Sequence, residues 1–292
     1  MFAAALSMCA ACSQDDEPAL THSSFAITVA DQGYNLAESA SSRTIEEGYV
    51  TKFVAEDACG LFVVRNNQVI LSNVKLTAAS AGNEALVWRC NEELSHREGD
   101  RYYLYYPWKE TATGMPAKEA AAEADFFAAM ATAWQPAVDQ TEYASYTASD
   151  LMVDEADVQV VDEKVSLTFG MTHSMALAVV KLPVTGTEEA SGQPVSGFRG
   201  TAQPYLDDLG LYRYLMNPAS AATLDGYYYK EGKERVFTID IPAGKLQVGT
   251  YMKYVVDGDA SDLKEISISS TITDWDMDDN GDVNADVNIP VS

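Results

Sequence analysis

The chain has 292 residues, enough for two domains of ordinary size, and 47% of them are hydrophobic, so it can form real cores and is not disordered throughout. Its 44 acidic residues outnumber the 19 basic ones, which gives a formal net charge of −25. Such a charge repels phosphate backbones and anionic lipid, and this argues against binding to nucleic acid.

The N-terminal residues resemble the leader of a bacterial lipoprotein. Met1–Ala11 is apolar and ends in small residues, as a signal peptide does, and Cys12 follows at once. In lipoproteins the cysteine at this point is lipidated, and the polar, acidic residues 13–17 are similar to a tag that directs such proteins to the outer surface of Bacteroidetes-type bacteria. We therefore expect a signal peptide over residues 1–11, a lipidated acidic linker over residues 12–22 and export to the outer membrane. The alternative is an unprocessed tail.

Alternating apolar and polar residues predict β-strands in the first half of the chain. These strands are expected within Phe25–Val29, Thr51–Val64, Gln68–Leu76, Glu84–Arg89 and Arg101–Trp108. Asn66 and Asn67 predict a hairpin turn between two of them. The stretch Lys118–Met130 is rich in strong helix formers and predicts a helix packed on a sheet, whereas Gln140–Tyr146 is expected to be a loop.

A long and almost uncharged run, Val165–Leu182, lies near the middle of the chain. It is long enough for a membrane helix, but its first residues alternate between apolar and polar, which indicates a strand. We interpret the run as one buried strand, or two with a kink near Gly170, that opens a second domain. The expected domains are therefore residues 23–160 and 161–292. His173, inside the run, is expected to be a hydrogen-bonded core histidine rather than a base.

Short strands separated by turns continue to the C-terminus. The clearest are predicted within Gly226–Tyr229, Arg235–Ile241, Thr250–Val256 and Glu265–Trp275. This regular spacing of strands and turns is typical of a β-sandwich.

Two features admit a site, each with a structural alternative. Cys59 and Cys90 can pair as a disulfide in an exported protein, or remain as two buried free thiols. An acidic stretch near the C-terminus has the spacing of the first part of an EF-hand calcium loop, but Val287 stands where the bidentate Glu should be. An acidic turn between strands is therefore the favoured interpretation, and no other cofactor is expected. The candidate calcium ligands are Asp276, Asp278, Asn280 and Asp282.

No nucleophile elbow, zinc-binding helix motif or phosphate loop occurs in the sequence, so we expect a protein that is not an enzyme. Two tyrosine-rich runs, within Tyr102–Trp108 and Tyr227–Tyr229, can line a sugar-binding face. Tyrosines on strands more often pack in the core or at its rim.

Several segments together resemble the fimbrillin-like proteins of Bacteroides and Porphyromonas. The resemblance covers nearly the whole chain in order, and it is carried by Glu56–Phe62, Tyr102–Trp108, Asp150–Met152, Phe169 to His173 and Ile272–Trp275. It implies a mainly β protein of two tandem transthyretin-like β-sandwich domains, with a short helix in the first, that assembles into surface fimbriae or sits at their tip or anchor.

The resemblance also implies a route of assembly. In related pilins an arginine-directed protease removes the first strand, and a partner's terminal strand fills the groove. Arg43 is placed for such a cut, although an ordinary loop arginine is an equal alternative. Ile266–Trp275 or Val283–Val291 can serve as the donor strand for other fimbrial subunits. An adhesin of this kind would meet a host or bacterial surface glycan or protein. The runner-up function is a glycan-binding surface lipoprotein of a nutrient-uptake system.

Overall fold

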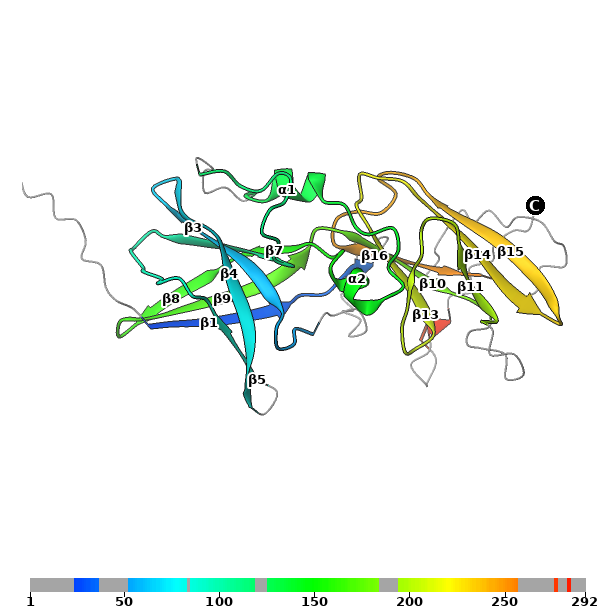
Figure 1. Cartoon of the computed structure of the whole chain (residues 1–292), viewed down its shortest axis with the longest axis horizontal. Helices are drawn as coiled ribbons and strands as arrows, with labels where there is room; N and C mark the ends of the chain where they lie inside the picture. Colours follow the sequence, from blue (N-terminus) through cyan, green and yellow to red (C-terminus); the bar gives the residue numbers. More distant parts are fainter. Residues whose placement is uncertain are drawn as a thin grey trace, which may run out of the picture.

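The computed structural model describes residues 24–36, 52–82, 85–118, 125–183, 194–256, 276–277 and 283–284. These residues form an elongated, mainly β molecule, with two short helices near its middle (Figure 1). Strands β3 to β9 lie toward one end and β10 to β16 toward the other. The predicted mainly β fold is thus confirmed. Among the described residues, no helix is long and apolar enough to cross a membrane.

An eight-stranded sheet forms the first half. Its strand order is β1-β9-β7-β6-β3-β4-β5, with β8 also paired to β9. The two ends of this order, β1 and β5, lie in contact, so the sheet curls around its own apolar face. The strands are β1 (Ser24–Asp31), β3 (Ala58–Arg65), β4 (Gln68–Gly82), β5 (Ala85–Arg89), β6 (Arg101–Tyr106), β7 (Met152–Glu155), β8 (Asp157–Val161) and β9 (Lys164–His173).

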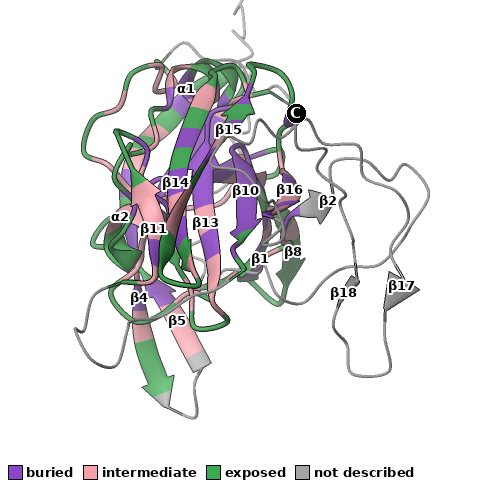
Figure 2. Cartoon of the chain, turned by 90° about the vertical axis from the view of Figure 1, so that its right-hand side faces the viewer, coloured by how far each residue is buried: buried purple, intermediate pink, exposed green. Residues whose placement is uncertain are grey.

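The second half consists of two packed sheets. A five-stranded sheet has the order β12-β13-β10-β16-β2, and a three-stranded sheet has the order β11-β14-β15. An apolar core that includes Val180, Tyr228 and Phe237 fills the space between them, as in a β-sandwich. The strands are β2 (Asn35–Leu36), β10 (Ala176–Lys181), β11 (Ser196–Arg199), β12 (Tyr205–Leu206), β13 (Leu211–Met216), β14 (Ala222–Lys230), β15 (Lys233–Ile241) and β16 (Thr250–Val255). Figure 2 shows the buried stretches of β10, β13 and β14.

The predicted hairpin turn at Asn66 and Asn67 is confirmed. The two residues join β3 to β4 with φ angles of 50° and 59°. Both angles lie in the left-handed region, which asparagine tolerates better than most residues and which a two-residue hairpin turn of this type requires.

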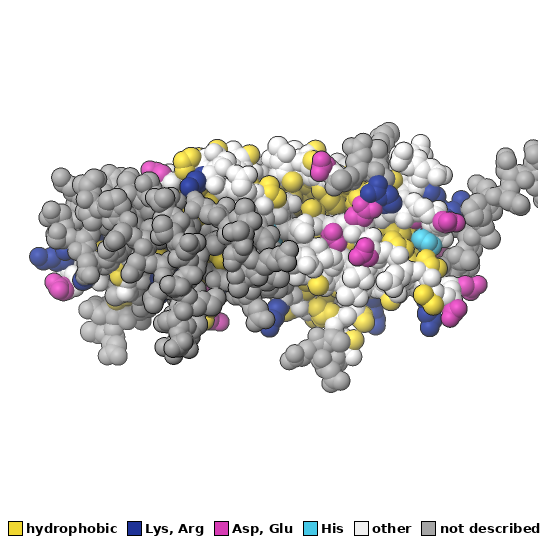
Figure 3. Space-filling view, turned by 180° about the vertical axis from the view of Figure 1, so that it is seen from behind, with side chains coloured by type: hydrophobic (Ala, Val, Ile, Leu, Met, Phe, Trp, Pro, Cys, Tyr) yellow, Lys and Arg dark blue, Asp and Glu magenta, His cyan; other side chains and the backbone are white. Residues whose placement is uncertain are grey.

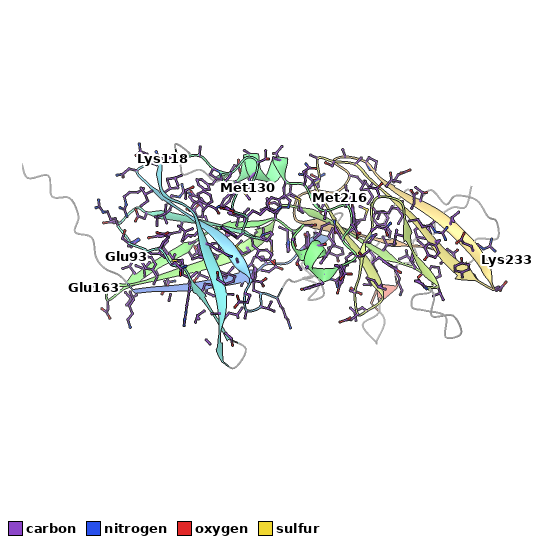
Figure 4. All side chains as sticks on the ribbon, viewed as in Figure 1. Glu93, Lys118, Met130, Glu163, Met216 and Lys233 are labelled. Atoms are coloured by element: carbon purple, nitrogen blue, oxygen red, sulfur yellow. The ribbon has the colours of Figure 1, made fainter. Side chains whose placement is uncertain are left out.

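A third apolar cluster joins the two halves. The outer face of the first sheet contributes Phe62 and Tyr105, and the second sheet contributes Leu177 and Leu215. Met130 of helix α1 (Ala128–Ala133) packs between them and is fully buried. Figure 4 shows Met130 and Met216 near the middle of the molecule, with Glu163 and Lys233 at its two ends.

The helix prediction is partly wrong. A turn occupies the last residues before Ala128, so the described helix is shorter and lies later than the expected Lys118–Met130. A second helix, α2 (Tyr143–Thr147), replaces the end of the loop expected over Gln140–Tyr146. Both helices are set by packing in the region between the sheets, where tertiary contacts override local propensity.

The topology also corrects the expected domain boundary. A division between residues 160 and 161 would separate β8 from β9, although these strands pair over five residues of each. The chain instead changes sheets between His173 and Ala176, and β9 runs without a break through Gly170. In β9, fully buried residues alternate with more exposed ones because only one face of the strand is fully covered. In β10, by contrast, Ala176 to Val180 are all buried because that strand has a core on each face.

Two buried amides bind the connecting segment to β13. Gln140 donates hydrogen bonds from Nε2 to the carbonyl oxygens of Ala137 (2.8 Å) and Leu215 (2.7 Å), and its Oε1 accepts one from the Leu215 N–H (2.9 Å). Asn217 donates from Nδ2 to the carbonyl oxygen of Trp134 at 2.9 Å. Side chains therefore satisfy backbone groups that would otherwise be unpaired between the halves.

Replacing Gln140 should destabilise the whole chain, because Leu215 would keep a buried N–H and a buried carbonyl without their partner. We expect Gln140→Ala to lower the free energy of unfolding by about 2–3 kcal/mol, measured by urea denaturation. Gln159→Ala, at an exposed position in β8, is the matched control and should change it by less than about 0.5 kcal/mol. Equal effects of the two substitutions would contradict this account.

Candidate functional site

The first strand is an edge strand. Within the described residues, β1 has one strand partner, β9, with which it pairs in parallel from Ser24↔Lys164 to Asp31↔Met171. Phe25, Ile27 and Val29 are half-buried and pack against the core of the first sheet. The residues between them are exposed, so the strand contributes one row of side chains to the core and presents the other to solvent.

The same segment continues from the first sheet into the second. Gln32 donates its N–H to the Met171 carbonyl oxygen at 2.9 Å, and the chain then enters β2, which pairs in parallel with β16. Figure 1 shows this first coloured segment running beneath β9 and on toward β16. Residues 24–36, which we call the N-terminal segment, therefore add an edge to both large sheets.

A buried cluster holds this segment at the point where it passes between the sheets. His173, at the end of β9, lies with Nδ1 2.9 Å from Asp150 Oδ2 and with Nε2 2.9 Å from Asp31 Oδ1. The Tyr34 ring stacks on the imidazole with centroids 3.6 Å apart, and its hydroxyl donates to Asp150 Oδ1 at 2.8 Å. We call these four residues the His173 cluster.

The electrostatics of the cluster favour a charged histidine. Burial lowers the pKa of His173, but the neighbouring carboxylates of Asp150 and Asp31 raise it by more, to about 9. Burial and the nearby Asp150 likewise raise the pKa of Tyr34 well above its usual value, so the phenol stays neutral and can donate. The histidine side chain is fully buried and has a carboxylate beside each ring nitrogen, so it cannot serve as an accessible base.

The prediction for His173 is confirmed, since it is a buried histidine hydrogen-bonded to a carboxylate. Sequence reasoning missed its partners Asp31, Tyr34 and Asp150 as a group. One signal was available for Asp31. The inward positions of the first strand, Phe25, Ile27 and Val29, are followed at the same two-residue period by this carboxylate, and a buried carboxylate needs a partner.

Cys59 and Cys90 correspond to the free-thiol alternative. Cys59 is buried and Cys90 is partly exposed, and both are free in the structure. Burial raises the pKa of the Cys59 thiol well above its usual value, which makes it unreactive.

Most of the other predicted site residues lie outside the described residues. These are Cys12, Arg43, Asp278, Asn280 and Asp282. Asp276 lies in β17 (Asp276–Met277), which pairs with β18 (Val283–Asn284). Within the part of the chain that the structure describes, no group of three or more His, Cys, Asp or Glu side chains could hold a metal ion.

The tyrosine runs serve mainly in packing. Tyr102, Tyr103, Tyr105 and Tyr106 are all buried, as is Tyr228 in the second run. On the face shown in Figure 3, the described acidic, basic and apolar side chains are interspersed rather than gathered by kind. A row of exposed rings that could stack on a sugar is therefore not formed by the Tyr102–Tyr106 run.

The fold and the cluster define a class of protein: a mainly β chain of packed sheets whose N-terminal segment closes the edges of two of them. No family model matches the chain. It is 29% identical to "Putative fimbrium tip subunit Fim1C" of Bacteroides ovatus, in a match that covers 85% of this chain and 49% of the relative. A crystal structure of a fimbrial protein from Bacteroides ovatus superposes with a TM-score of 0.63 at 26% identity, covering 91% of this chain and 54% of the other.

These matches agree with the resemblance found in the sequence: the chain is similar to fimbrial proteins of Bacteroides. It spans about half the length of the curated relative and of the solved structure that it matches.

The His173 cluster should make stability depend on pH in the alkaline range. A folded-state pKa of about 9 lies above the usual value of 6.5, so the stabilisation is fully present below pH 6.5 and is lost as the pH rises through 9. We expect the free energy of unfolding to fall between pH 6.5 and 10, as measured by urea denaturation. The fall should be larger for the native chain than for His173→Gln, by on the order of 2 kcal/mol.

His96→Gln is the control for this experiment. His96 is partly exposed and contacts the Tyr102 hydroxyl at 3.0 Å, with no carboxylate beside it in the described structure. That variant should keep the full alkaline loss. If the free energy of unfolding of His173→Gln and of the native chain fell by the same amount between pH 6.5 and 10, the ion pairs of His173 would not contribute to the pH dependence of stability.

Proposed function

We propose that this chain is a non-enzymatic subunit of a bacterial surface fimbrium, and that it joins other subunits when a partner's strand replaces its N-terminal segment. The observation that carries the proposal is the position of residues 24–36 as the added edge of both large sheets. The fimbrial relatives support the general role, and the geometry of the edge supports the mode of assembly.

The edge has the properties that strand replacement requires. Backbone groups of β9 and β16 pair with the N-terminal segment, and any extended chain can supply the same hydrogen bonds. The half-buried Phe25, Ile27 and Val29 fill sites along the core of the first sheet, so an incoming strand gains affinity by filling them again. The segment can leave without breaking the pairing of any other two strands, because it is at the end of both strand orders.

Arg43 is placed in the sequence to free this segment. It stands seven residues beyond Leu36, so a cut after it would separate the whole of residues 24–36 from the remaining sheets. Cys12 lies before the same cut, and a lipid on Cys12 would therefore leave with the segment. In this proposal the uncut chain is held at the outer membrane and the cut chain is free to enter a fimbrium.

The non-enzymatic role rests on the same cluster. His173 is enclosed between two carboxylates and an aromatic ring, where it holds strands together instead of facing a substrate.

Incubation of the full chain with an arginine-specific protease tests the proposal. We expect a cut after Arg43 and release of the N-terminal peptide, both detected by mass spectrometry. We also expect oligomers to form, detected by size-exclusion chromatography. Arg43→Gln should stay uncut at this site and monomeric under the same conditions. A chain that is cut after Arg43 and has lost residues 24–36, yet remains monomeric at high concentration, would falsify assembly by strand replacement.

A further inference from the structure

The inward face of the N-terminal segment has a polar end. Phe25, Ile27 and Val29 point toward the apolar core of the first sheet, and Asp31 occupies the next inward position. The Asp31 side chain is fully buried and meets His173 Nε2 at 2.9 Å. The groove alongside β9 thus contains three apolar sites followed by one site for a carboxylate.

Loss of the segment changes the surroundings of His173. Asp31 and Tyr34 belong to the segment and leave with it. Asp150 lies just before β7, outside the segment, and therefore stays beside Nδ1. Nε2 then faces the empty end of the groove. An occupant with an apolar side chain at this position would bury a ring nitrogen with no acceptor, which is costly, and one with a lysine would place two cations together.

We infer that the groove selects its partner by a carboxylate: it takes an extended segment that runs parallel to β9, with three apolar side chains at alternate positions and an Asp or Glu at the fourth, opposite His173. This inference rests on the proposed function, since it specifies the strand that replaces residues 24–36. The apolar sites provide most of the affinity, and the acid fixes the register, because a slip of two residues would place an apolar side chain against the imidazole.

The sequence distinguishes the two stretches named above as possible donors. Ile268, Ser270, Ile272 and Asp274 follow one another at two-residue intervals and bring an acid to the fourth position, although Ser270 is polar and leaves two of the three preceding positions apolar. The later stretch offers Val283, Ala285 and Val287 but has Ile289 in that place. In a second copy of this chain, only the earlier stretch therefore matches the acid requirement when it runs parallel to β9.

Peptide exchange into the full chain tests the inference. A sequence-specific protease site is inserted after Arg43, the chain is cut, and fluorescein-labelled peptides of residues 24–36 are added at pH 7. By fluorescence anisotropy, we expect the Asp31→Asn peptide to bind at least tenfold more weakly than the native peptide. The matched control is the Thr28→Ala peptide, altered at an exposed position, which should bind within about twofold.

The reciprocal change is made in the protein. With cut His173→Gln, the native and Asp31→Asn peptides should bind alike, because the acid has lost its partner. An unlabelled peptide of residues 266–277 should displace the native peptide at lower concentration than one of residues 283–291.

The outcomes separate the two proposals. Equal binding of the native and Asp31→Asn peptides to the cut native protein would overturn selection by a carboxylate while strand replacement stood. If no peptide bound, strand replacement itself would fail, and this inference with it.

Discussion

The ionic contact between His173 and two aspartates is the interaction that holds the N-terminal segment at the junction between the sheets. It joins three separate parts of the chain at the junction between the sheets: the end of β9, Asp150 just before β7, and the N-terminal segment. Tyr34 covers the imidazole and uses its hydroxyl to orient Asp150. Removing His173 leaves two buried carboxylates without their partner, and breaking a buried ion pair in this way typically costs 3–5 kcal/mol.

Two further sets of contacts hold the sheets together independently of the segment. One is the apolar cluster built on Met130, Leu177 and Leu215. The other is the pair of buried amides, Gln140 and Asn217, that satisfy backbone groups between the halves. Of residues 24–36 only Tyr34 belongs to the apolar cluster, and the two amides bond to residues outside that segment, so we expect the two halves to keep their connection when the segment departs. The contacts that join the two halves are thus largely distinct from the N-terminal segment, which is the part that a partner's strand would replace.

Local patterns predicted much of the fold. The alternation in residues 165–171 and the Asn66-Asn67 turn were sufficient to predict β9 and the β3–β4 hairpin, since both depend on neighbouring residues alone. The domain boundary could not be placed in this way. The run from Val165 to Leu182 is almost uncharged because it passes from one core to the next, and only the strand partners show where the change occurs.

The site was predicted only in part for a related reason. A lone histidine in an apolar run implies hydrogen-bonding partners, but Asp31 and Asp150 are distant in sequence, and parallel pairing of β1 with β9 is what brings the first of them to His173. Short helices such as α2 depend on the same long-range packing, and no local signal marks them.

The central claim is that β1 must leave β9 before subunits can join. Thr28 and Thr168 are register partners with exposed side chains, so cysteines at these positions can form a disulfide across the two strands. In a chain with Cys9, Cys12 and Cys90 changed to serine, we predict that the oxidised Thr28→Cys, Thr168→Cys variant, once cut after Arg43, remains monomeric and that reduction allows oligomers to form. Oligomers of equal size and amount before and after reduction would contradict the account.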